Sequence, residues 1–121
     1  MSKRRQERMN VEIQRALARI IQEQIKDPRI DFASVSIIRV EVSNELSHAR
    51  VYVSVLGDSK KQDETMQALQ NAKGYIRTEL FQNIQVKHAP ELDFRLDRSI
   101  EHGIHIASLL DGLKEEQRGQ D

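Results

Sequence analysis

The chain has 121 residues, a formal net charge of zero, no cysteine and no tryptophan. This length favours one domain, and the lack of cysteine excludes a disulfide framework, a thiolate nucleophile and a thiolate metal site. Aromatic residues make up only 4% of the chain, so base stacking is not expected to dominate any binding of nucleic acid. No apolar run approaches the roughly 20 residues of a membrane span, and we expect a cytoplasmic protein without membrane association.

The zero net charge conceals an asymmetry between the two ends of the chain. Residues 1–29 carry eight basic and four acidic side chains, a net of +4, whereas residues 99–121 carry two basic and five acidic ones, a net of −3. A basic end in an otherwise neutral chain indicates an anionic partner at that end.

The first expected element is a helix from about Ser2 to Lys26. It should end before Asp27-Pro28, because a residue that precedes proline avoids the helical region. Its apolar residues recur on one side, and the opposite side carries a narrow stripe of Arg4, Arg8, Arg15, Arg19 and Lys26. A charged outer face is common on amphipathic helices, but a merely solvated face would usually mix both signs. The uniform sign favours an anion-binding surface.

Two segments with period-two alternation follow, Val35 to Val42 and Ala49 to Leu56. Each is expected to be a half-buried strand. The apolar residues expected on the buried face are Ile38, Val40 and Val42 in the first strand and Val51, Val53 and Val55 in the second. The segment from Ser43 to His48 should connect the strands through a turn.

A pair of helices meeting at Ala72-Lys73-Gly74 comes next. Ser59 and Gln62 have the spacing of a capping box, so the first helix should begin there and run to about Asn71. The second should run from about Tyr75 to between Gln82 and Ile84 and bury Ile76, Leu80 and Ile84.

The C-terminal part predicts one more strand and one more helix. Leu92, Phe94 and Leu96 alternate with polar residues after Pro90. Ser99 can then cap an amphipathic helix whose apolar residues are Ile100, Ile104, Leu109, Leu110 and Leu113. The complete order is helix-strand-strand-helix-helix-strand, which predicts an α+β domain with a C-terminal helix.

This order resembles a type II KH domain, an RNA-binding fold. In ordinary KH domains a Gly-x-x-Gly loop between the paired helices lets the phosphate backbone approach closely. Here Ala72-Lys73-Gly74 stands in its place, so the two helices should be nearly continuous, with a kink at Ala72 and Gly74. That departure is similar to the pattern of the ribosome-binding factor A family. Further matching segments are Lys26 to Ile30, Val40 to Ser43, Leu46 to Gly57, Gly74 to Arg77, and Pro90, Leu92, Phe94, Asp97 and Ser99.

The resemblance extends from Arg5 to Leu113 and implies both fold and role. It implies a three-stranded sheet packed on helices, with residues 1–98 as a KH-like RNA-binding domain and residues 99–121 as an amphipathic helix and polar tail. It implies a monomeric assembly factor without enzymatic activity or cofactor, which binds the free small ribosomal subunit and its 16S rRNA. The implied role is late maturation, including formation of the 5′-terminal helix and rRNA processing, with importance in the cold. A ribosome-associated GTPase is implied in release.

Two groups of residues are candidates for RNA binding. Lys73 and Arg77 are four residues apart, so they project from one side of the helix beside the kink, and Gly74 leaves room for a phosphate backbone. The alternative is that Gly74 only permits tight helix packing and that the two charges are solvated. The second group can follow a phosphate backbone by charge alone and comprises Arg4, Arg5, Arg8, Arg15 and Arg19.

Other function classes have weaker support. His102 and His105 have the spacing of a metal-binding pair, but only Glu101 lies nearby, so the ligand set is incomplete. No arrangement of residues indicates an activated nucleophile, and we expect no catalytic residue and no metal ligand. The rival from another class is a protein-interaction module that docks a protein through its C-terminal helix. Deletion from Ser99 onward separates a docking helix from one that belongs to the core.

Overall fold

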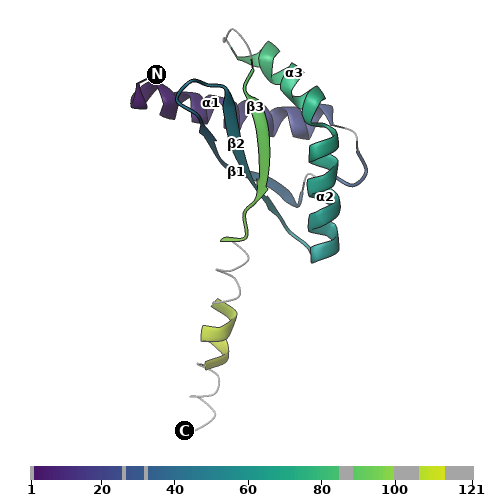
Figure 1. The fold of residues 1–121 in the computed structure, drawn as a ribbon. Coiled ribbons are helices and arrows are strands. Elements are labelled where there is room, and N and C mark those ends of the chain that lie inside the picture. Colours follow the sequence, from purple (N-terminus) through teal and green to yellow (C-terminus); the bar gives the residue numbers. More distant parts are fainter. Residues whose placement is uncertain (1, 26, 32, 85–88, 100–106, 114–121) are drawn as a thin grey trace.

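The computed structural model describes residues 2–25, 27–31, 33–84, 89–99 and 107–113. Its elements are α1 (Lys3–Gln24), β1 (Val35–Val42), β2 (His48–Val55), α2 (Ser59–Asn71), α3 (Lys73–Asn83) and β3 (Glu91–Leu96) (Figure 1). Residues 107–113 form a further short helical segment. The predicted element order is confirmed, and β1 has the predicted bounds.

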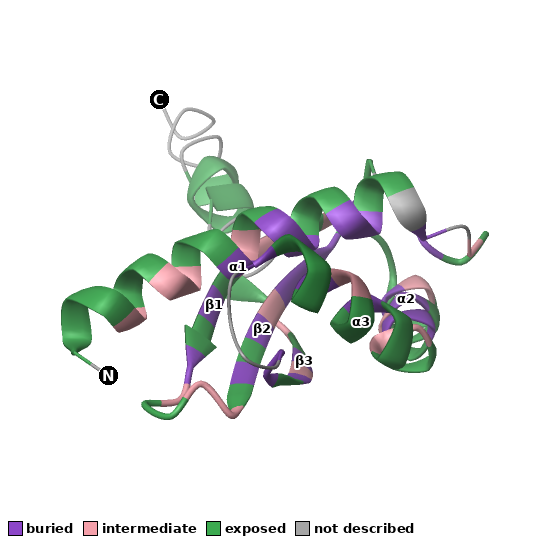
Figure 2. Ribbon diagram, turned by 90° about the horizontal axis from the view of Figure 1, so that it is seen from above, coloured by how far each residue is buried: buried purple, intermediate pink, exposed green. Residues whose placement is uncertain are grey.

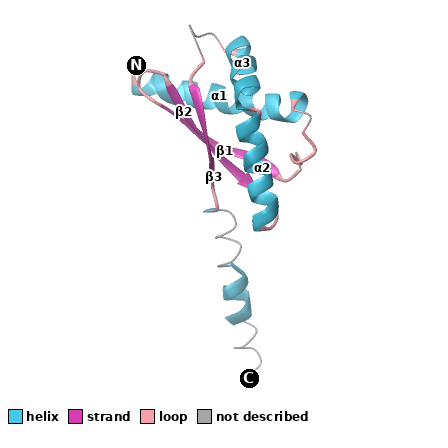
Figure 3. Cartoon of the chain, turned by 45° about the vertical axis from the view of Figure 1, so that its right-hand side comes forward, coloured by secondary structure: helices cyan, strands magenta, loops and turns pink. Residues whose placement is uncertain are grey.

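The three strands form one sheet in the order β1-β2-β3 (Figure 3). β1 and β2 are antiparallel, whereas β2 and β3 are parallel. Parallel neighbours require a crossover rather than a tight turn, and α2 and α3 together provide it. This α+β arrangement confirms the predicted KH-like type II fold.

The hydrophobic core lies between one face of the sheet and the three helices. Figure 2 shows the buried residues of α1 from its middle to its C-terminal end, whereas its first turns are exposed or intermediate. Ile13, Leu17 and Ile20 of α1 are fully buried, as are Val51 and Val53 of β2. The remaining core residues from the other elements include Val40, Val42, Leu69, Ile76, Leu80, Leu92 and Phe94. The predicted buried faces of β2, α3 and β3 are therefore confirmed.

The prediction that Ile38 lies on the same buried face as Val40 and Val42 is wrong. The pairing of β1 with β2 shifts register between Ile37 and Arg39, so Ile38 is the extra residue of a β-bulge. Beyond the bulge the alternation changes phase, and Ile37 packs against the core instead. The Nε2 amide of Gln14 donates to the carbonyl oxygens of Ile37 at 3.1 Å and Ile38 at 3.3 Å, which stabilises the bulge.

Two further polar side chains fasten α1 to the far end of β1. The Nε2 amide of Gln6 donates to the Val42 carbonyl oxygen at 2.7 Å. The Val42 N–H donates to Oδ1 of Asn10 at 2.9 Å. Because both backbone groups of Val42 are satisfied in this way, α1 and the end of β1 are held in a fixed relation.

The helix ends differ slightly from the predicted ones. Ser2 accepts a hydrogen bond from the Arg5 N–H as the N-cap of α1, and the helix ends at Gln24 because Ile25 is extended. Lys26, the predicted last residue, lies outside the described residues. The N-cap of α2 is Asp58 rather than part of a box beginning at Ser59, since its carboxylate accepts from the Lys61 N–H at 2.8 Å. Gln62 donates instead to the buried Val55 carbonyl oxygen.

Candidate nucleic-acid interface

The junction of α2 and α3 is a single residue, Ala72. Its φ of −87° and ψ of 0° end α2, yet its N–H still donates to the Ala68 carbonyl oxygen at 3.0 Å. Its own carbonyl oxygen accepts from the Ile76 N–H at 2.9 Å. The hydrogen bonding therefore continues while the helix axis changes direction (Figure 1). The predicted helix-kink-helix is confirmed with its kink at Ala72, whereas the prediction that Gly74 shares the kink is wrong, because Gly74 lies within α3.

Gly74 lies in the first turn of α3 with one side open to solvent. A Cβ atom at this position would meet no other atom within 4 Å, and the residue is exposed. The alternative that Gly74 is needed for tight helix packing is therefore wrong. The absence of a side chain leaves the α3 backbone accessible to a ligand at this point.

Lys73 and Arg77 flank this glycine, but they are not equivalent. Lys73 is half-buried, whereas Arg77 is exposed. The Arg77 guanidinium donates to the Ala89 carbonyl oxygen from Nε at 3.3 Å and from Nη2 at 3.1 Å. The alternative that Arg77 is merely solvated is therefore wrong, because its side chain has a structural role at the entry to β3. A guanidinium has five N–H donors, so the anchored side chain keeps donors for an anion.

All five candidate arginines of α1 are exposed: Arg4, Arg5, Arg8, Arg15 and Arg19. Arg4, Arg5 and Arg8 line a surface hollow beside the Ser2 cap. Arg19 lies at the other end, where its Nη2 donates to Oδ1 of Asn83 in α3 at 3.2 Å. α1 packs against α3, and this hydrogen bond joins Arg19 to the last residue of α3, whereas Arg4, Arg5 and Arg8 lie at the opposite end of α1.

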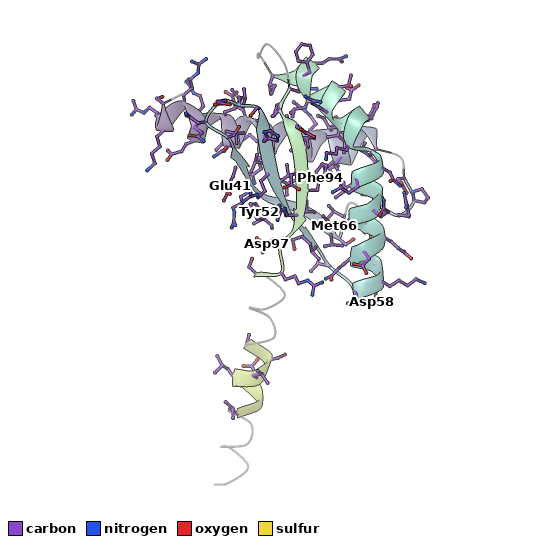
Figure 4. All side chains as sticks on the ribbon, in the orientation of Figure 1. Glu41, Tyr52, Asp58, Met66, Phe94 and Asp97 are labelled. Atoms are coloured by element: carbon purple, nitrogen blue, oxygen red, sulfur yellow. The ribbon has the colours of Figure 1, made fainter. Side chains whose placement is uncertain are left out.

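The face of the sheet that the helices leave uncovered has a different electrostatic character. The Arg39 guanidinium lies 4.0 Å from the centre of the Tyr52 ring and forms ion pairs with Glu41 at 3.3 Å and Asp97 at 3.9 Å. Figure 4 shows Glu41 of β1, Tyr52 of β2 and Asp97, which follows β3, in this region. Arg95 is likewise paired with Asp93. Because acidic and basic groups neutralise each other here, this face is a poorer match to RNA than α1 and α3.

Two exposed aromatic residues of α3 were not predicted as site residues. Tyr75 and Phe81 are 49% and 46% exposed. The signal was present in the sequence, because both positions fall outside the predicted buried stripe of Ile76, Leu80 and Ile84. Aromatic rings that a helix does not use for its core are candidates for binding.

The C-terminal candidates lie mostly beyond the described part of the chain. Ile100, Ile104 and the histidine pair at His102 and His105 fall within residues that are not described. In residues 107–113, Leu109, Leu110 and Leu113 are 55–56% exposed. Across the described ranges, no group of three or more acidic or histidine side chains is placed to hold a metal ion. No described helix combines the length and apolarity needed to cross a membrane.

Comparisons with known sequences agree on one family. The family model described as ribosome-binding factor A matches residues 5–110. A ribosome-binding factor A from Syntrophomonas wolfei is 64% identical over 121 residues, which cover 100% of this chain and 99% of the relative. Another from Desulfitobacterium hafniense is 44% identical and covers 97% of this chain and 92% of its own length.

Solved structures give the same answer for the fold and the family. The solution structure of a Thermotoga maritima protein is 37% identical, with a TM-score of 0.71 over 84% of this chain and 94% of its own. A homology model of the Thermus thermophilus ribosome binding factor A, fitted into an electron-microscopy map of its complex with 30S, is 25% identical, with a TM-score of 0.63 over 77% of this chain and 96% of its own. By sequence and by fold, the chain belongs to the ribosome-binding factor A family.

Proposed function

We propose that the protein is a non-enzymatic ribosome assembly factor that binds the free small ribosomal subunit through its 16S rRNA. The observation that carries the proposal is the α3 start, where an accessible glycine backbone at Gly74 lies between Lys73 and the anchored Arg77. The exposed arginines of α1 offer a second basic surface on a neighbouring helix. Cations hold RNA phosphates, and a glycine lets a phosphate backbone approach the helix closely.

The family relationship supports the choice of ribosomal RNA over other anions. The relatives are named for ribosome binding, and the Thermus thermophilus protein was fitted into a 30S complex. We further propose that the protein acts late in maturation, during formation of the 5′-terminal helix and rRNA processing.

A role in the cold has a physical basis. Wrong RNA pairings become longer-lived as the temperature falls, and a protein that binds one arrangement better than another shifts their populations by its differential affinity. Such an effect needs neither a cofactor nor nucleotide hydrolysis by the protein itself. We propose that a ribosome-associated GTPase supplies the energy for release, and that the protein acts as a cytoplasmic monomer.

Co-sedimentation of the purified protein with small subunits, large subunits and assembled ribosomes tests the proposal. Selective association with free small subunits is expected. Of the seven candidate cations on α1 and α3, Arg19 already donates to Asn83, which leaves six to contact phosphates. About six phosphate contacts predict roughly a thousandfold loss of affinity between about 50 mM and about 200 mM salt. Equal binding to every particle, or binding that ignores salt, would contradict the proposal.

A second candidate function rests on the exposed leucines of residues 107–113. We propose that residues 1–98 form the RNA-binding domain and that residues 99–121 are an extension that it does not need for folding. Leu109, Leu110 and Leu113 then offer an apolar stripe to a protein partner. A variant ending at residue 98 that stays folded and loses subunit binding would support this docking role.

A further inference from the structure

The side of α3 that faces away from the core has an unusual composition. Opposite Ile76 and Leu80, the 3.6-residue period of the helix places five exposed residues, which we call the outer face of α3: Gly74, Tyr75, Thr78, Phe81 and Gln82. None of the five is charged, in a chain in which 31% of residues are charged. Surface helices usually present charged residues to water, so this composition indicates a face that a partner covers.

The outer face holds two of the five aromatic residues of the chain. Phe81 and Tyr75 expose nearly half of their surface, whereas Phe94 is 4% exposed in the core. Phe81 follows Gly74 by seven residues, so its ring lies two turns, about 10 Å, further along the same side of the helix. The exposed part of each ring offers a flat apolar surface to a flat ligand.

Positive charge borders the outer face on one side only. Arg77 lies three residues after Gly74 and four before Phe81, so it is a neighbour of both on the helix surface. Its two hydrogen bonds to the Ala89 carbonyl oxygen fix the guanidinium in place, and Lys73 precedes it by one turn. Cations beside rings and an open backbone match a single-stranded nucleic acid, which combines charged phosphates with flat bases.

We propose that the outer face of α3 binds a single-stranded segment of RNA, with bases stacked on Phe81 and Tyr75 and phosphates against Lys73 and Arg77. This inference rests on the proposed function and specifies the form of RNA that the site takes. The low aromatic content of the chain predicted that base stacking would not dominate binding; the proposal assigns stacking to α3 alone.

The test compares replacements of Phe81 by tryptophan, leucine and alanine in binding to free small subunits. Stacking requires a ring, so Phe81→Trp should stay within about threefold of wild type, whereas Phe81→Leu and Phe81→Ala should both weaken binding by about 5- to 150-fold, the range for one stacked base. The salt dependence should not change, because no phosphate contact is lost. Tyr75→Ala should act in the same direction as Phe81→Ala.

Leu56→Ala is the matched control, because Leu56 is 54% exposed and precedes α2 at the end remote from Gly74. It should bind as wild type does. If Phe81→Leu binds normally and Phe81→Trp does not, residue 81 fits a protein pocket of limited size instead of stacking on a base, and the inference is overturned. It is also overturned if Phe81→Ala, still folded by thermal unfolding, binds as wild type does. Failure of the wild type to bind any small subunit would instead contradict the proposed function.

Discussion

Replacement of Gly74 by alanine should make the protein more stable and less able to bind. Gly74 lies in α3, and the only glycine with positive φ in the described ranges is Gly57. Helical glycine costs roughly 0.5–1 kcal/mol relative to alanine. Because the new Cβ would meet nothing within 4 Å, this gain in the free energy of unfolding is not offset by a clash. The melting temperature should rise by about 2–6 °C.

The same methyl group should interfere with RNA. If a phosphate backbone approaches the bare helix at Gly74, an added methyl overpacks a close contact at a cost of about 1–3 kcal/mol. This corresponds to a loss of affinity of about 5- to 150-fold. Thermal unfolding and small-subunit co-sedimentation of the same preparation measure both effects, and their opposite signs exclude misfolding as the cause.

Gly57→Ala provides the matched control. Gly57 has a φ of 140°, and a Cβ there would lie 2.6 Å from Cδ of Lys61. Left-handed backbone strains a residue with a side chain, so this variant should melt at a lower temperature yet bind normally while it is folded. Wild-type binding by Gly74→Ala would refute the role of the open backbone, and a fall in its melting temperature would refute the assigned helical geometry.

Other variants test single features of the structure. Lys73→Glu should weaken subunit binding and reduce the salt slope by about one, with little change in melting temperature. Arg77→Glu should weaken binding and also lower the free energy of unfolding by about 1–3 kcal/mol, because the Ala89 carbonyl loses its donor. Equal loss of stability in both variants would contradict the structure. Deletion of residues 99–121 should leave the melting temperature nearly unchanged, since no core residue comes from this segment in its described part; unfolding of the truncated protein would show that the segment belongs to the core. Hydrogen bonds from Arg29, Ala33 and Ser99 hold the pKa values of Asp27, Asp31 and Asp97, respectively, below the ordinary 3.8. Because these pKa values are lower in the folded state, the carboxylates contribute stability above pH 3.8 that is lost as the pH falls below it; a melting temperature that does not fall in that range would contradict these contacts.

Sequence patterns predicted the elements well where local chemistry decides the structure. The two-residue alternation fixed the bounds of β1 and the buried face of β2 because both follow from side-chain burial along a single strand. The α2–α3 junction followed from the family resemblance at Ala72-Lys73-Gly74. These features need no knowledge of distant contacts.

The prediction errors arise where two neighbouring residues are both suited to the same role, or where a residue distant in the chain determines the local structure. Asp58 and Ser59 are both good N-cap residues, and the local sequence does not rank them. Ile38 became a bulge through the pairing of β1 with β2 and the hydrogen bonds from Gln14. That amide is 24 residues away in the chain, so period-two alternation alone could not reveal the change of phase.

The candidate site was predicted as a set of residues rather than as a surface. The cations at Lys73 and Arg77 were identified from their spacing, but the anchoring of Arg77 depends on where β3 places Ala89. The Arg19–Asn83 contact that links α1 to α3 joins residues 64 positions apart. The openness of Gly74 likewise depends on packing, which only the folded chain defines.

Directed cleavage of ribosomal RNA tests the central claim, that α1 and α3 form the face that contacts RNA. Because the chain has no cysteine, an iron chelate can be tethered at one introduced thiol: Val11→Cys on the exposed side of α1, Thr78→Cys on the outer face of α3, or Asp63→Cys on the exposed side of α2. With each variant bound to small subunits, strong cleavage of 16S rRNA from residues 11 and 78 and little from residue 63 is the predicted result. Cleavage mainly from residue 63 would contradict the account and place the RNA on another face of the domain.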